Sequence, residues 1–353
     1  MIEQLFRSYL IAYLFWFAVA LGCLPLLMLH HLVGGTWGFV IRRILEAGTR
    51  TLPLMAVLFV PLLFGIHSLY EWSHPEVVAG DVVLEAKRAY LNVPFFIVRA
   101  ILYFVVWMTF AFFLNRWSAE QDATGNPSIV SRFQLLSAPG IVAYCLAITF
   151  AAIDWAMSLE PHWFSTIYGI LFIVGQSLAA LAFVIPIAAM LSESPPVSEV
   201  MKPPVFLDLG NLLLAFVMLW AYISFSQYLI IWSGNLPEEI TWYLNRGRNG
   251  WQWVAAFLAL FHFAVPFALL LGRGNKRNKM PLAGIATAVL LMRWVDVYWL
   301  VAPAFFPAVR IHVADVVLFV VIGAIWLLVF FNQLTKRALL PQRDPNFVLE
   351  RAA

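Results

Sequence analysis

Nine long runs of apolar residues, separated by shorter polar stretches, make up most of this chain of 353 residues. A helix crosses a bilayer with about 20 mostly apolar residues, because it satisfies its own backbone hydrogen bonds. The pattern therefore predicts an all-α polytopic membrane protein with nine transmembrane helices. The runs cover residues 8–31, 51–70, 93–114, 139–159, 163–191, 207–232, 251–271, 281–302 and 313–334.

Composition agrees with this pattern, because 63% of the residues are hydrophobic and only 12% are charged, a balance foreign to water-soluble domains. Lys and Arg outside the runs divide unequally between the two sides. The side of the N-terminus has Arg7, Lys87, Arg88, Arg246, Arg248 and Arg310, and the other side has Arg42, Arg43, Arg50, Arg116, Arg132, Lys202, Arg273, Lys276, Arg277, Lys279, Lys336, Arg337, Arg343 and Arg351. The positive-inside rule predicts an outside N-terminus and a cytoplasmic C-terminus. Lipid is an expected partner and nucleic acid is not.

A short sequence spacing that occurs twice suggests how the helices group. Asp154 near the end of the fourth run precedes Pro161 by seven residues, and Asp296 in the eighth run precedes Pro303 by the same distance. A duplicated four-helix unit would give this spacing. We therefore expect two four-helix bundles, formed by spans 1–4 and spans 5–8, with the ninth helix flanking them.

The corresponding domain boundaries are 1–160, 161–304 and 305–353, the last comprising the flanking helix and a cytoplasmic tail. Within the first domain, residues 37–50 read as an amphipathic lead-in whose arginines, Arg42, Arg43 and Arg50, lie at the lipid headgroups. Residues 115–138 are expected to form a cytoplasmic loop around the turn signal at 124–127. Residues 233–250 are expected to contain a short interfacial helix that begins at Pro237.

Four ionisable residues fall inside the apolar runs: Arg99, Asp154, Arg293 and Asp296. A charge at the membrane centre costs about 2.5–3.5 kcal/mol on insertion scales, so it persists when it is paired or faces a polar cavity. Arg293 and Asp296 lie three residues apart and share a helix face. Two interpretations stay open. The charges clamp helices together, or they line a polar pocket toward the outer face where a carboxylate accepts or relays protons.

The sixth run carries a polar stripe, because Trp220, Ser224, Gln227 and Tyr228 recur at helical spacing. Such a stripe often holds neighbouring helices together in lipid. Asp208 lies at its predicted cytoplasmic mouth, and Gln176 and His262 lie near the midplane of spans five and seven. Together with Arg293 and Asp296, these residues would line the second bundle as a proton pathway; His262 could equally be a packing residue.

The sequence offers few residues for metal or haem chemistry. Cys23 and Cys145 are the two cysteines, and both fall within spans. Haem attachment motifs, four-Cys sets and zinc spacings are absent from the sequence. The histidines lie at unequal depths, which argues against a ligated b-type haem. We predict neither a metal site nor a covalently bound cofactor, and we assign no catalytic residue.

Two segments carry a resemblance to a known family. They are FAAIDWAMSLEPHWFSTIYG at residues 150–169 and LIIWSGNLPEEITWYL at residues 229–244. Both resemble the smaller NrfD-like integral membrane component of alternative complex III, the bacterial quinol:cytochrome c oxidoreductase. This resemblance extends from about Arg7 to the last span. Family members carry one more span at the N-terminal end.

The resemblance implies a fold of two four-helix bundles, as in the polysulfide-reductase membrane-subunit superfamily, within a bacterial inner membrane. It implies as partners a sibling NrfD-like membrane subunit, an iron–sulfur subunit, haem c subunits and small single- or two-span membrane subunits. Menaquinone is the ligand that it suggests, while haem c and iron–sulfur clusters would belong to the partner subunits. For this chain it implies a non-redox subunit that supports menaquinol oxidation and conducts protons through Asp154, His262, Arg293 and Asp296.

Two other functions compete with this expectation. A secondary transporter would need helices broken at matching positions of the two halves, yet Pro186 and Pro266 do not correspond. A purely structural scaffold would use the buried charges only to lock helices. Changing Asp296 and Arg293 to uncharged residues separates the scaffold from a functional site.

Overall fold

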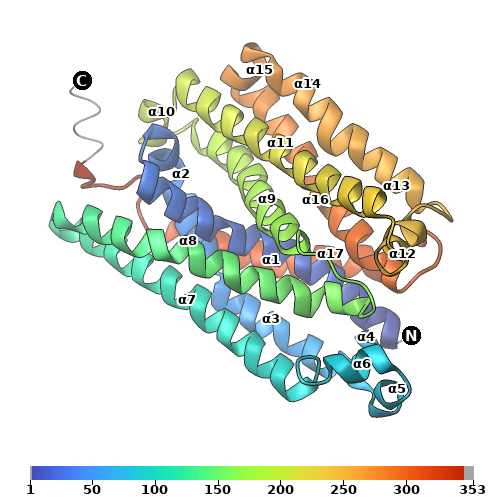
Figure 1. The fold of residues 1–353 in the computed structure, drawn as a ribbon. Coiled ribbons are helices and arrows are strands. Elements are labelled where there is room, and N and C mark those ends of the chain that lie inside the picture. The colour runs from blue at the N-terminus through green and yellow to red at the C-terminus, as the bar shows by residue number, and fades with distance from the viewer. Residues whose placement is uncertain (1, 346–353) are drawn as a thin grey trace.

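The computed structural model describes residues 2–345, and within them the chain forms helices and no strand (Figure 1). Nine helical segments of this part are long and apolar enough to span a membrane, which confirms the predicted fold class. Arg351 and the end of the predicted tail, 346–353, lie outside the described residues. The spanning segments are α1 (Ile2–Val33), α2 with α3 (Thr36–Thr49, Leu52–Phe64), α7 (Val93–Thr124), α8 (Ser128–Trp155), α9 (Tyr168–Leu191), α11 (Pro203–Gly234), α13 to α14 (Trp251–Leu258, Val265–Leu271), α16 (Lys279–Val301) and α17 (Val313–Thr335).

Short helices cover both ends of the long ones. We call the end where α1 begins the N-side and the end where α1 finishes the C-side. The N-side has α4 (Ile66–Leu69), η1 (Glu71–Ser73), α5 (Pro75–Ala79), α6 (Val82–Lys87), η2 (Met157–Leu159), α12 (Pro237–Arg246) and η4 (Ala302–Ala304), and the C-side has α10 (Val197–Val200) and α15 (Arg273–Arg277). The helix α12 corresponds to the short helix predicted at 233–250.

We divide the spanning helices into the two predicted groups of four, with α17 packed against α1 and α2. The first group contains α1, α2–α3, α7 and α8, and the second contains α9, α11, α13–α14 and α16. Helices α1 and α9, one from each group, pack closely along the centre of the molecule. At Gly22 of α1 a Cβ would come within 2.1 Å of the backbone carbonyl oxygen of Gln176 in α9, so only glycine permits this approach. The exact domain boundaries stay a prediction.

Helix α1 is buried along nearly its whole length, which its uniformly apolar sequence explains. It is covered by helices of both groups and by α17. Two tryptophans fasten α17 in place, since Trp16 Nε1 donates to the carbonyl oxygen of Phe319 at 2.9 Å and Trp326 Nε1 donates to Thr51 Oγ1 at 2.8 Å.

Two expectations about the C-side are wrong. The predicted loop at 115–138 is mostly helix, because α7 continues to Thr124 and α8 begins at Ser128; only the turn signal at 124–127 was correct, with Gly125 in the left-handed region at φ 66°. Helix α2 is not an interfacial lead-in, because nearly all of its residues are buried. Both errors have one cause, namely that polar residues of α7 pair with arginines of α2 instead of facing water.

Candidate functional site

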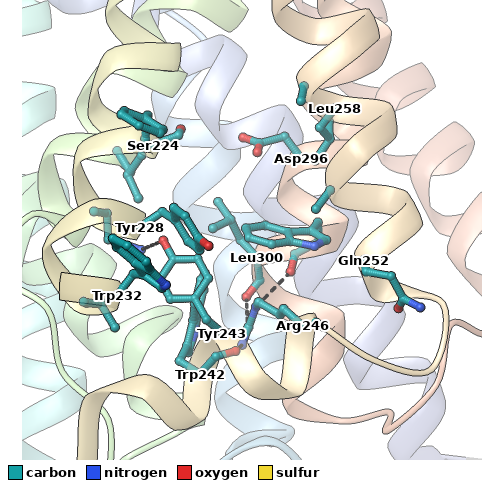
Figure 2. A pocket seen from close by; sticks show the side chains of 18 of the residues that line it. Ser224, Tyr228, Trp232, Trp242, Tyr243, Arg246, Gln252, Leu258, Asp296 and Leu300 are labelled. Carbon is teal, nitrogen blue, oxygen red and sulfur yellow. Dashed lines mark hydrogen bonds between the residues drawn. The ribbon is translucent and has the colours of Figure 1, made fainter. Parts of the chain in front are cut away.

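A cavity of about 930 Å³ lies in the N-side half of the second bundle (Figure 2). Its walls come from α11, α12, α13 and α16. The predicted stripe of α11, Trp220, Ser224, Gln227 and Tyr228, lines one wall, so the stripe faces a cavity as well as neighbouring helices. Exposed Phe225, 60% accessible, lies at the rim. The cavity therefore opens at the surface of the helical bundle, at a level within span six.

Asp296 of α16 lies at the inner end of this cavity, where its carboxylate points between α11 and α13 (Figure 2). Its Oδ2 atom accepts hydrogen bonds from Arg293 and from Trp220 Nε1, the latter at 3.2 Å. No hydrogen bond to Oδ1 is found among the described residues, so this oxygen can accept one from a ligand. The sequence spacing correctly predicted the Arg293–Asp296 pair.

Two neighbouring helical segments have local features that accommodate the Arg293–Asp296 pair. A Cβ at Gly175 of α9 would come within 2.3 Å of Arg293 Nη2, so the glycine provides the space for the guanidinium. Between α13 and α14 the chain forms a π-helical segment, η3 (Ala259–Ala264), a feature frequent at functional sites. This segment places His262 against Trp220, with ring centroids 4.2 Å apart. His262 is fully buried, and neither ring nitrogen has a hydrogen-bond partner among the described residues.

The N-side end of the cavity is closed by α12, which the sequence predicted, and is fixed by Arg246, which it did not. The Arg246 guanidinium is buried and pairs with Glu160 at 2.8 Å. It also donates to the carbonyl oxygen of Leu300 at 2.9 Å and stacks on Trp242, 3.6 Å from the ring centroid. Arg246 and Glu160 are 86 residues apart, so no local spacing could have revealed their contact.

Polar side chains of α11 and α12 meet across the cavity. Gln227 is buried, donates from Nε2 to the Tyr243 hydroxyl at 3.3 Å and accepts from Ser165 at 3.2 Å. The rings of Tyr228 and Tyr243 meet edge to face at 5.2 Å. Burial raises the pKa of Tyr243 to about 12, while the hydrogen bond from Gln227 acts in the opposite direction. Tyr243 therefore stays protonated at neutral pH and can donate into the cavity.

In the first bundle, Arg99 of α7 pairs with Asp154 of α8, the partner that the sequence left open. Arg99 donates from Nε and Nη2 to the two carboxylate oxygens at 2.8 and 2.9 Å. The Tyr103 hydroxyl donates to the same carboxylate at 2.7 Å. The guanidinium also stacks on Tyr90, 3.8 Å from the ring centroid, and donates to its carbonyl oxygen. Neither partner of this pair lines the large cavity.

Two of the residues predicted to line a proton pathway, Gln176 and Asp208, lie away from the cavity. Gln176 of α9 is buried at the junction of the bundles, where its Oε1 accepts from the Tyr144 hydroxyl at 2.8 Å. Asp208 is exposed on α11 and does not line the cavity. Its neighbour Asn211 instead accepts from Lys276 at 2.7 Å. Of the predicted residues, the structure brings together Gln227, His262, Arg293 and Asp296.

The C-side arginines form a buried network instead of contacting headgroups. Arg42 pairs with Glu46 and Asp344, both at 2.9 Å, and Arg43 pairs with Glu46 at 2.7 Å and with Asp122. Arg42, Arg43 and Glu46 are each about 1% accessible or less. Spacings of three and four residues between Arg43, Arg42 and Glu46 are a sequence signal that could have identified this network.

Comparison with known proteins gives no family for this chain, because no family model and no curated protein matches it. Within residues 2–345, no group of three His, Cys, Asp or Glu side chains is placed to hold a metal ion. The fold and the site therefore define a multi-pass membrane protein with one large, aromatic-lined cavity and a buried acid at its inner end.

Proposed function

We propose that this protein is the integral membrane subunit of a respiratory quinol:electron-acceptor oxidoreductase, similar to the smaller NrfD-like component of alternative complex III. In this proposal it lies in a bacterial inner membrane with the N-side outside. Its role is to support menaquinol oxidation and to take up the protons released. Redox centres, iron–sulfur clusters and haem c, would belong to partner subunits, since the described residues provide no cluster of metal ligands.

The cavity is the observation that carries this proposal. A quinol is an aromatic ring with two hydroxyl groups and a long apolar tail. The cavity offers aromatic walls, an opening at the level of the span, and a carboxylate with one free oxygen at its inner end. Pockets of 300–1,000 Å³ with a few convergent polar groups are typical of small-molecule sites. These features fit an amphiphile that enters from lipid.

The residues at the cavity indicate a division of tasks. Asp296 Oδ1 can accept a hydrogen bond and then a proton from a quinol hydroxyl. Arg293 holds the carboxylate in place and Trp220 fixes its second oxygen. Oxidation of one quinol to a quinone releases two protons and two electrons, and the electrons would pass to an iron–sulfur or haem centre of a partner subunit. Asp296 would thus accept one proton, the second would leave to water in the cavity, and the partner subunit would take both electrons.

The two segments that resemble the family meet at this cavity. Trp163 of the first segment stacks on Trp242 of the second with ring centroids 4.8 Å apart. Trp163 Nε1 also donates to the carbonyl oxygen of Glu239 at 3.0 Å. Residues of the second segment, Trp242 among them, line the cavity, and the first segment packs against this wall from outside.

A transporter gains no support from the helices. Span seven is irregular at η3 and span two is interrupted between α2 and α3, but their counterparts in the other bundle, α7 and α11, are continuous. Matching breaks in two halves, which a midplane transport site would use, are therefore missing from the described spans. The scaffold alternative leaves the cavity and the free oxygen of Asp296 without a role.

The first experiment is to purify the protein from native membranes in mild detergent. We expect it to copurify with haem c and iron–sulfur subunits, with menaquinone extractable from the complex. The second compares Asp296→Asn with Asp208→Asn, an exposed carboxylate on α11 outside the cavity. We expect quinol oxidation by the assembled complex to fall at least tenfold in the first variant and to stay unchanged in the second. Isolation without redox partners, or equal turnover of both variants in an intact complex, would contradict the proposal.

A further inference from the structure

A second, smaller cavity lies at the opposite end of the molecule, on the C-side of the first bundle. Its volume is about 190 Å³, room for about six water molecules at 30 Å³ each. It lies between the end of α1, the beginning of α2, and the C-side ends of α7 and α8. The lining residues that matter here are His30, His31, Arg42, Gln121, Phe133 and Asp344.

Several polar atoms at this cavity lack a hydrogen-bond partner among the described residues. Gln121 is only 1% accessible, and neither its side-chain nitrogen Nε2 nor its oxygen Oε1 has a hydrogen-bond partner among these residues. Arg42 Nη2 and His31 Nε2 are in the same condition. An unpartnered buried polar group costs about 1–3 kcal/mol. Gln121 needs both a donor and an acceptor, so the natural occupant carries oxygen acceptors and at least one hydroxyl.

The beginning of α2 adds a feature that favours an anion. Gly34 and Gly35 line the cavity in the left-handed region, with φ of 74° and 92°, and Gly35 is the N-cap of α2 without a side-chain hydrogen bond. The N-terminus of a helix carries partial positive charge and free backbone N–H groups. The positive end of this 14-residue helix therefore lies at the same cavity that Arg42 and Gln121 line.

Charges around the cavity limit what the occupant is. Arg42 already forms two ion pairs: its Nε donates to Glu46 and its Nη1 donates to Asp344. The remaining Arg42 Nη2 is available for one more acceptor. Binding would thus rest mainly on hydrogen bonds, with the helix N-terminus favouring negative charge and Asp344 opposing it. A singly charged phosphate diester fits this balance better than a doubly charged free phosphate.

We propose that this cavity binds a glycerol-phosphate group. Phosphate oxygens accept from Arg42 Nη2 and Gln121 Nε2 near the positive N-terminus of α2, and a glycerol hydroxyl donates to Gln121 Oε1. The charge balance favours the diester headgroup of an anionic phospholipid, and free glycerol phosphate, a monoester, is the alternative source that the test distinguishes. This site lies at the other end of the molecule from the quinol cavity and does not depend on the proposed function.

The test uses the full chain, in its complex if it assembles into one, and native mass spectrometry. We expect the wild type to retain one phosphatidylglycerol-type lipid per chain. Gln121→Leu removes the two unpartnered atoms at nearly constant size and should lower this retention at least tenfold. Asn332→Leu, an exposed amide of α17 outside the cavity, is the matched control and should behave as the wild type.

Delipidated wild-type protein supplies a second measurement that does not require the variant to fold. Its unfolding temperature is followed while phosphatidylglycerol, phosphatidylethanolamine or glycerol 3-phosphate is added. A rise with phosphatidylglycerol alone identifies the headgroup, and a rise with glycerol 3-phosphate identifies the free compound. If none of these additions raises the unfolding temperature, or if Gln121→Leu keeps the lipid, the cavity holds water only and the proposal is overturned.

Discussion

The two buried Arg–Asp pairs share a chemistry but differ in their surroundings. Asp154 in span four and Asp296 in span eight occupy equivalent places in the repeated sequence spacing, each seven residues before a proline. The Asp154 carboxylate receives three hydrogen bonds, two from Arg99 and one from Tyr103. The Asp296 carboxylate receives bonds on one oxygen, while the other faces a cavity.

This difference favours a structural role for the Arg99–Asp154 pair and is what the proposed function requires of the Arg293–Asp296 pair. A carboxylate whose oxygens are all engaged holds α7 and α8 together and has no capacity left for a ligand. A carboxylate with a free oxygen beside a cavity can exchange a proton. The clamp interpretation of the sequence thus fits the first bundle, and the pocket interpretation fits the second.

The largest effect that tests this comparison is the loss of stability in Asp154→Asn. The change leaves Arg99 buried with no anionic partner, which costs about 3–5 kcal/mol. We expect Asp296→Asn to lose less than half as much, because the amide oxygen can still accept from Arg293 and Trp220 while the new NH2 group faces the cavity. Denaturant unfolding of both variants in the same detergent measures the difference. Equal losses at the two sites would contradict the assignment of separate roles.

A smaller effect is expected from Gly175→Ala, which sharpens the comparison at the second pair. The new methyl group would occupy the space of the Arg293 guanidinium, and overpacking of this kind costs about 1–3 kcal/mol. Since the guanidinium must move, we also expect quinol oxidation by the assembled complex to fall. Gly284→Ala is the control, because a Cβ there meets no neighbouring atom within 4 Å. Unchanged activity of Gly175→Ala would show that the position of Arg293 is unimportant.

The smallest effect concerns the loop that follows α8. His162 of this loop contacts Asp81, the N-cap of α6, with 2.5 Å between Nε2 and Oδ2. The hydrogen bond from His162 and those from the backbone N–H groups of Leu84 and Val83 lower the pKa of Asp81 below its usual value of 3.8. Because the pKa of Asp81 is lower in the folded state than in the unfolded state, its ionised carboxylate stabilises the fold. This stabilisation is complete above pH 3.8 and is lost as the pH falls through the folded-state pKa.

Hydrogen exchange of the α6 amides checks this pH dependence. Protection of Val83 and Leu84, which donate to Asp81, should be constant above about pH 5 and should fall below about pH 3.8. In Asp81→Asn the same amides should show no such step. A step that persists in the variant would assign the titration to another group.

The sequence predicted what depends on local spacing. The nine spans, the Arg293–Asp296 pair, the stripe on α11 and the short helix α12 all follow from residues a few positions apart. The partners of Arg99 and Arg246 could not be predicted, because Asp154 and Glu160 reach them only through tertiary packing across 55 and 86 residues. Arg42 and Arg43 were misplaced because composition alone does not tell an interfacial amphipathic helix from one buried against polar partners.

The contact of Gly22 with the carbonyl of Gln176 bears on how such a protein could work. Because the backbones of α1 and α9 meet without side chains between them, sliding or rocking of one bundle against the other would have to separate a tightly fitted seam at the middle of the membrane. If Asp296 takes up protons as proposed, it would do so in a rigid frame, where rotating side chains and water, and not moving helices, would carry the charge.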